Sequence, residues 1–253
     1  MSGPAIDATD EQARRAAFAA MPSEIAILDE LILHINNGLA RLSGFPNDRG
    51  LNFLGMLLVN KAFGSLWRAR EDAICGYPVQ SLTLCRAALE DWGTLFYVER
   101  HPETTNRWLQ DVVEEVQACR RPPSFKDICN DLGDLGQKAY ETYGVLSLFP
   151  HPRSGGLPWL YDWDKDKVYF HTGGYFDRRN LEVCFYFLII VAQLFWERIA
   201  QLQLRVLGDA VSNWVERGNE ISSQAGAFVD RVHDETLARL QAAGLAAGTN
   251  DTN

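Results

Sequence analysis

The chain has 253 residues, of which 47% are hydrophobic and 23% are charged, and its formal net charge is -9. This composition is typical of a globular protein with a sizeable core and argues against an intrinsically disordered chain. The negative charge excludes a polycation built for nucleic acid or anionic membranes, so nucleic acid is expected to bind only through a local basic patch.

Residues 1–22 are predicted to form an N-terminal arm that is partly helical. The first residues are acidic and lack the apolar region of a signal peptide, and the five cysteines include no C-x-x-C pair. Cys75, Cys85 and Cys184 lie in apolar helical patterns, as expected of reduced cysteines in a core. The sequence therefore predicts a cytoplasmic protein.

Residues 23–243 are predicted to form one domain, an all-α multi-helix bundle. Ser23 follows Pro22 and is the predicted N-cap of the first helix. Apolar residues recur every three or four positions in eight runs: at about 23–44, 50–76, 79–100 and 102–121, in two shorter runs within 124–149, and at 178–207 and 209–243. The polar residues 244–253 are predicted to form a disordered tail.

The run at 178–207 contains the apolar stretch VCFYFLIIVA, residues 183–192. It is shorter than the roughly 18 residues that a membrane-spanning helix needs, and Glu197 and Arg198 close it. We therefore expect a long central helix that is apolar on all sides, and no membrane partner. Residues 150–178 precede it with alternating aromatic residues around a polar turn, which predicts a short β-hairpin or loop insertion.

Tyr143, Ser147 and His151 are spaced four residues apart at the end of a predicted helix. Tyr143 and Ser147 share a helix face, and Pro150 ends the helix so that His151 follows its C-terminus. Two interpretations stay open. His151 caps the last carbonyl groups, or it lines a polar pocket with Tyr143, Ser147 and Arg153.

A second part of this candidate pocket lies in the run at 79–100. Arg86, Glu90, Gly93 and Tyr97 form a stripe beside the apolar seam of that helix. The ordinary interpretation of Arg86 and Glu90 is an exposed ion pair, which contributes about 0.3–0.5 kcal/mol. If the stripe instead faces the helix that carries Ser147, both residues belong to the pocket.

Metal binding is an alternative. Glu30 and His34 are four residues apart, and Asp230 and His233 are three apart, which is the spacing used by di-metal sites in helical bundles. A complete site needs further inward-facing carboxylates. The sequence contains no zinc spacing, phosphate-binding glycine loop or nucleophile elbow, so its motifs identify no cofactor.

The pattern Y-x-x-L-S-x-x-x-H-P at residues 143–152 resembles the signature of an uncharacterised, mostly bacterial family of all-helical proteins that is loosely HEPN-like. LTLCRAALEDWGTLFYVERHPE, residues 82–103, is similar to that family's L-x-R-x-x-x-E helix. The resemblance covers residues 50–205 and implies a helical bundle that is often a dimer. Several HEPN-like domains are ribonucleases that use an Arg-x4–6-His pair, but Val145, Leu146 and Ser147 stand where the arginine is required.

These features predict a soluble helical protein that acts as a binding or interaction module. It is expected to form a homodimer and to take a small molecule, a nucleotide or a partner segment in a polar pocket around His151. The alternative is an enzyme, either an atypical HEPN-like nuclease or a metal-dependent helical-bundle enzyme.

Overall fold

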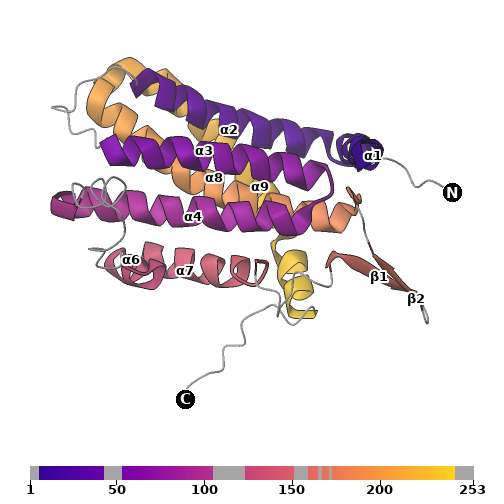
Figure 1. Ribbon diagram of the computed structural model, residues 1–253. Coiled ribbons are helices and arrows are strands. Elements are labelled where there is room, and N and C mark those ends of the chain that lie inside the picture. Colours follow the sequence, from indigo (N-terminus) through magenta and orange to yellow (C-terminus); the bar gives the residue numbers. More distant parts are fainter. Residues whose placement is uncertain are drawn as a thin grey trace.

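The computed structural model describes residues 6–42, 53–104, 123–150, 159–164, 167–170 and 173–242. These residues form a helical bundle, so the predicted all-α class is confirmed (Figure 1). The described helices, in chain order, are α1 (Ile6–Ala20), α2 (Pro22–Leu42), α3 (Phe53–Ile74), α4 (Pro78–Arg100), η2 (Pro102–Thr104), α6 (Phe125–Asp131), α7 (Asp134–Leu146), α8 (Arg178–Leu207), η4 (Gly208–Val211) and α9 (Ser212–Ala242).

The ends of α8 follow from local chemistry. Asp177 precedes the helix, and its side chain accepts a hydrogen bond from the backbone amide of Asn180, which satisfies one of the unpaired amides of the first turn. The helix stops at Gly208, whose φ of 59° is a backbone conformation that glycine adopts readily. The predicted limits of 178–207 therefore agree with the structure.

The predicted start of α2 is wrong by one residue. The helix begins at Pro22, where the fixed φ and the missing amide hydrogen of proline are tolerated, so Ser23 lies inside the helix and is not its cap. Only Met21 separates α1 from α2, and its amide still donates a hydrogen bond to the carbonyl of Ala17. Most of the predicted N-terminal arm is thus the helix α1.

The helix α8 is the centre of the bundle. It packs against α2, α3, α4 and α9, and most side chains from Leu181 to Trp196 are buried, with Phe185, Leu188 and Trp196 at most 1% exposed. Within the helical span Arg178–Ala238, one window of 18 residues is apolar enough to cross a membrane by length and composition alone, and 72% of that window is buried inside the protein. Such burial is what a core helix of a helical bundle shows.

Close approach between α8 and α9 depends on a glycine. A Cβ atom at Gly218 of α9 would lie 2.1 Å from the ring of Trp196, closer than any side chain can sit. The indole nitrogen of Trp196 donates a hydrogen bond of 3.1 Å to Asn219, one residue further on. Gly218 therefore lets the two long helices meet across the largest buried side chain of α8.

Two smaller elements flank the bundle. The helices α6 and α7 lie along α4 (Figure 1). Phe125 of α6 occupies the space that a side chain at Gly93 would take. The strands β1 (Tyr161–Asp164) and β2 (Lys167–Phe170) pair in antiparallel register, Tyr161 with Phe170 and Asp164 with Lys167. They lie at the same end of the bundle as α1 (Figure 1).

The helix α1 lies at the end of the bundle and turns away from the direction of the long helices (Figure 1). It buries mainly small side chains, Ala13 and Ala17, together with Met21 after its end, whereas Phe18 remains 42% exposed. Because burial of a methyl group contributes far less than burial of a large apolar side chain, polar contacts have a large share in fixing this helix. Those contacts form the site described below.

Candidate functional site

The structure brings together three of the residues predicted for the pocket. Arg86 of α4 donates a hydrogen bond of 2.8 Å to the hydroxyl of Tyr143 on α7, and its guanidinium carbon lies 4.9 Å from the centre of the Tyr143 ring. Glu90 forms an ion pair with Arg86 at 3.1 Å. The stripe on α4 therefore faces α7. The side chain of Arg86 is 22% exposed and that of Glu90 is 42% exposed, so the ion pair is only partly exposed.

Ser147 is engaged by its own helix. Its hydroxyl donates a hydrogen bond of 2.7 Å to the carbonyl of Tyr143, four residues earlier, as serine side chains near helix ends often do. His151 and Arg153 lie outside the described residues, so both interpretations of His151 stay predictions. The Nε atom of Arg86 is buried and receives no partner within the described ranges.

The residues of the alternative metal site have other partners. His34 stacks on Trp214 with ring centres 4.5 Å apart, and its Nε2 donates a hydrogen bond to the Trp214 carbonyl. Glu30 forms an ion pair with Arg217, and His233 is hydrogen-bonded to the hydroxyl of Tyr186. Asp230 is exposed. Across the described part of the chain, no three or more His, Cys, Asp or Glu side chains are grouped to hold a metal ion.

A polar cavity lies between α1 and α3, at the end of the bundle. Its volume is about 260 Å³, and we call it the α1–α3 cavity. Four of its side chains are carboxylates, two are guanidinium groups, and a thiol and a phenol complete the lining: Asp10, Glu11, Arg14, Arg68, Glu71, Asp72, Cys75 and Tyr77. No residue predicted as a site from the sequence is among them.

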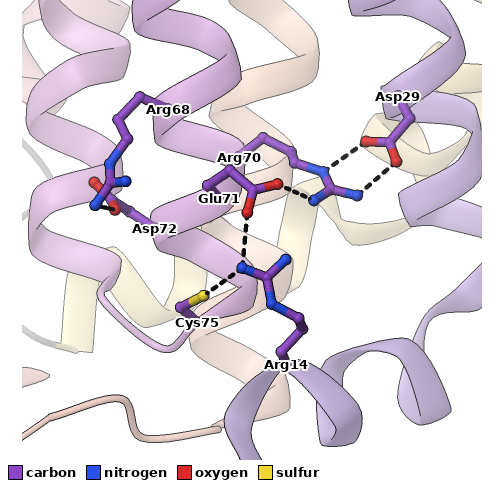
Figure 2. A network of polar contacts seen from close by, with 7 residues as sticks. All are labelled: Arg14, Asp29, Arg68, Arg70, Glu71, Asp72 and Cys75. Carbon is purple, nitrogen blue, oxygen red and sulfur yellow. Dashed lines mark hydrogen bonds and ion pairs between the residues drawn. The ribbon is translucent and has the colours of Figure 1, made fainter. Parts of the chain in front are cut away.

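Arg70 anchors one wall of this cavity from inside the bundle. Its side chain is 5% exposed, and it donates two hydrogen bonds, of 2.6 and 2.5 Å, to the two carboxylate oxygens of Asp29 on α2 (Figure 2). A third hydrogen bond, of 2.5 Å, goes to Glu71. The planar guanidinium group can donate to two carboxylates at once, so Arg70 fixes the position of the Glu71 carboxylate from the core side.

Arg14 extends the same network to α1. It donates a hydrogen bond of 2.8 Å to the second carboxylate oxygen of Glu71 and lies 3.1 Å from the sulfur of Cys75 (Figure 2). On the other side of Glu71, Arg68 pairs with Asp72 at 2.9 Å. The charged walls of the cavity are therefore held in place by contacts among themselves and need no ligand to order them.

Asp10 joins α1 to the segment that follows β2. Its Oδ1 accepts a hydrogen bond of 2.6 Å from the hydroxyl of Tyr77 and one of 3.0 Å from the amide of Gly174. Next to Tyr77, Gly76 has a φ of 83°, and a Cβ there would lie 2.4 Å from the backbone of Tyr175. Only glycine permits this turn between α3 and α4 to approach the segment so closely.

A second cavity, of about 230 Å³, is lined in part by this turn, and we call it the aromatic cavity. It shares Tyr77 with the α1–α3 cavity and adds Trp159 and Tyr175. No charged side chain of the described residues lines it; the lining consists of Gly76, Tyr77, Pro78, Gln80, Trp159, Leu160, Gly173, Tyr175 and Asn180. A charged and an uncharged cavity thus adjoin at Tyr77.

Three titratable groups of the α1–α3 cavity have shifted pKa values. Burial raises the pKa of the Cys75 thiol, although Arg14 opposes this shift, so the thiol stays protonated and poorly reactive at neutral pH. The hydrogen bond to Asp10 raises the pKa of Tyr77 to about 12 and keeps its hydroxyl a donor. Burial also raises the pKa of Asp72, against the effect of Arg68.

A signal for this cavity is present in the sequence of α3. Arg70 lies four residues after Leu66 and four before Ile74, which are both buried, so it falls at a position that faces the core. A charged side chain at such a position requires a buried partner. The partners Asp29 and Arg14 come from other helices, and spacing within one helix cannot identify them.

A comparison with known protein families finds no family that matches this chain, and comparisons with characterised proteins and with solved structures find no match either. The class of protein is therefore defined by its own fold and site. It is a helical bundle with a polar cavity at one end.

Proposed function

We propose that this protein is a binding module whose ligand occupies the α1–α3 cavity. The observation that carries this proposal is a cavity of about 260 Å³ whose charged walls are ordered by internal ion pairs. Ligand sites are usually preformed concave spaces with a few fixed polar groups, and their volume is on the order of 300–1,000 Å³. The two adjoining cavities together reach the lower part of that range.

The described lining offers no activated thiol. A thiol that acts as a nucleophile at neutral pH needs a lowered pKa, whereas burial raises the pKa of the Cys75 thiol. Fixed ion pairs such as Arg14 with Glu71 also reduce the entropy lost when a ligand becomes ordered against them. These are properties of a preorganised receptor site.

The remaining expectations from the sequence stay predictions. They are a pocket around His151, a homodimer, a cytoplasmic location and a binding partner that is neither a membrane nor extended nucleic acid. The two enzyme alternatives, an atypical HEPN-like nuclease and a metal-dependent bundle enzyme, stay predictions as well. Elemental analysis of the purified protein tests the metal alternative, because such an enzyme retains stoichiometric iron or manganese.

A thermal-shift screen tests the proposed binding function. The library contains cationic, anionic and neutral compounds of metabolite size, and ligands of the wild-type protein are remeasured on Arg68→Ala and Arg178→Ala. Both arginines are largely exposed and pair with an acid four residues later, but only Arg68 lines the cavity. We expect ligands whose affinity changes in Arg68→Ala and not in Arg178→Ala. A screen without ligands, or ligands indifferent to Arg68, contradicts the proposal.

A further inference from the structure

The charges around the α1–α3 cavity indicate the sign of its ligand. Four carboxylates face two guanidinium groups in the lining, so the cavity carries an excess of negative charge if all are ionised. A concave site lined by one sign of charge concentrates ligands of the opposite sign and repels those of the same sign. An anionic ligand is therefore disfavoured.

Three of the four carboxylates already have a cationic partner. Glu71 is held by Arg14, Asp72 by Arg68, and Glu11 by Arg15 on its own helix; the distances are 2.8, 2.9 and 2.8 Å. These ion pairs neutralise most of the charge of the site.

Asp10 differs from the other three. Both of its hydrogen bonds come from neutral donors, Tyr77 and Gly174, and both reach Oδ1. Within the described ranges no lysine, arginine or histidine lies within 4.0 Å of its carboxylate. Asp10 is also half-buried, where solvent screens its charge less than at an open surface. A cation supplied by a ligand would complete this site.

The aromatic cavity offers a place for an uncharged part of the same ligand. Tyr77 holds Asp10 through its hydroxyl and forms a wall of the uncharged cavity with Trp159 and Tyr175. Faces of aromatic rings attract cations and pack well against apolar groups. A ligand that reaches from Asp10 past Tyr77 therefore meets a carboxylate first and an uncharged, aromatic space beyond it.

We propose that the ligand is an organic cation, with a primary ammonium or guanidinium group at Asp10 and an apolar body in the aromatic cavity. This inference rests on the binding function proposed above and adds the chemical class of the ligand. Protonated amines on an aromatic or aliphatic body are the simplest members of the class. The ammonium group donates to the carboxylate oxygen of Asp10 that Tyr77 and Gly174 leave open.

Three probes with the same body and different head groups test this inference by isothermal titration calorimetry. They are 3-phenylpropylamine, 3-phenylpropanol and 3-phenylpropionate. We expect the amine to bind, the alcohol to bind at least tenfold more weakly, and the carboxylate to give no heat of binding. Asp10→Asn removes the charge and keeps an oxygen that can accept the hydrogen bonds from Tyr77 and Gly174. It should weaken amine binding about tenfold, whereas Asp234→Asn, an exposed position on α9, should not.

The other outcomes contradict the cation inference, the role of Asp10 or the binding function, as follows. Equal or tighter binding of 3-phenylpropionate overturns the cation inference and leaves the binding function in place. Amine binding that is unchanged in Asp10→Asn overturns the role of Asp10. If none of the three probes binds while the library screen yields ligands of the cavity, the cation inference alone fails. If neither experiment yields a ligand, the binding function fails with it.

Discussion

Arg14 and Glu71 join the first helix to the body of the bundle. Their side chains meet at 2.8 Å between α1 and α3, and Glu71 is held from the opposite side by Arg70. Because α1 buries few large apolar side chains, this contact contributes more to its placement than the same contact would on a well-packed helix. The position of α1, which forms one wall of the α1–α3 cavity, therefore depends on the ion pair between Arg14 and Glu71.

Replacement of Arg14 is expected to loosen α1 without unfolding the bundle. The Arg14 side chain is 35% exposed, so Arg14→Ala should lower the free energy that resists local opening by about 1 kcal/mol. Hydrogen exchange of the α1 amides should then become about fivefold faster, while exchange in α8 is unchanged. Arg15→Ala, which removes an exposed pair within α1, is the matched control. Equal rates in both variants would show that Arg14 does not hold the helix.

Replacement of Arg70 is expected to destabilise the whole protein. Arg70→Met leaves the carboxylates of Asp29 and Glu71 without their buried partner, and removal of one member of a buried ion pair costs about 3 kcal/mol. Urea unfolding followed by circular dichroism measures this loss. Arg68→Met changes an arginine that is 70% exposed and should cost less than about 1 kcal/mol. Similar losses in the two variants would contradict the buried role of Arg70.

Two glycine substitutions in helices are expected to change stability in opposite directions. Gly218→Ala places a methyl group 2.1 Å from the Trp196 ring, and such overpacking costs about 1–3 kcal/mol, more than the gain in helix propensity. Gly64→Ala meets no atom of the described residues within 4 Å, so it should stabilise the protein by about 0.5–1 kcal/mol. Urea unfolding of both variants checks the signs. A stabilised Gly218→Ala protein would contradict the contact between α8 and α9.

His34 is expected to make stability fall in mild acid. Burial against Trp214 lowers the pKa of His34, so the unfolded ring takes up a proton at a higher pH than the folded ring. The unfolded state therefore gains protons first as the pH falls through about 6.5, and the folded state loses stability there. His34→Phe removes this contribution. Its free energy of unfolding should fall less between pH 7 and pH 5 than that of the wild type, and parallel curves would contradict the assignment.

The elements of the bundle could be predicted because they depend on local patterns. The limits of α8 follow from its continuous apolar run, from Asp177 before it and from Gly208 after it. The start of α2 was misplaced because Pro22 fits the first position of a helix as well as it fits the position before a cap. Local patterns of this kind carry no information about which helices meet.

The candidate site depends on contacts between helices, and such contacts cannot be predicted from the spacing of residues within one helix. Arg86 and Tyr143 are both candidates for the predicted pocket, and the sequence leaves open whether they meet; the structure joins them by a hydrogen bond. The network of Arg70, Asp29 and Arg14 joins three helices that are distant in sequence. Periodicity shows that Arg70 faces the core, but the choice of its partners is made by tertiary packing.

A crystal structure of the protein with the tightest ligand of the screen would show whether the ligand occupies the α1–α3 cavity. We expect electron density for the ligand in this cavity, with its polar group beside Asp10 and its body against Tyr77. Density at another place, such as beside Arg86 and Tyr143, with the α1–α3 cavity unchanged, would contradict the claim that this cavity is the binding site.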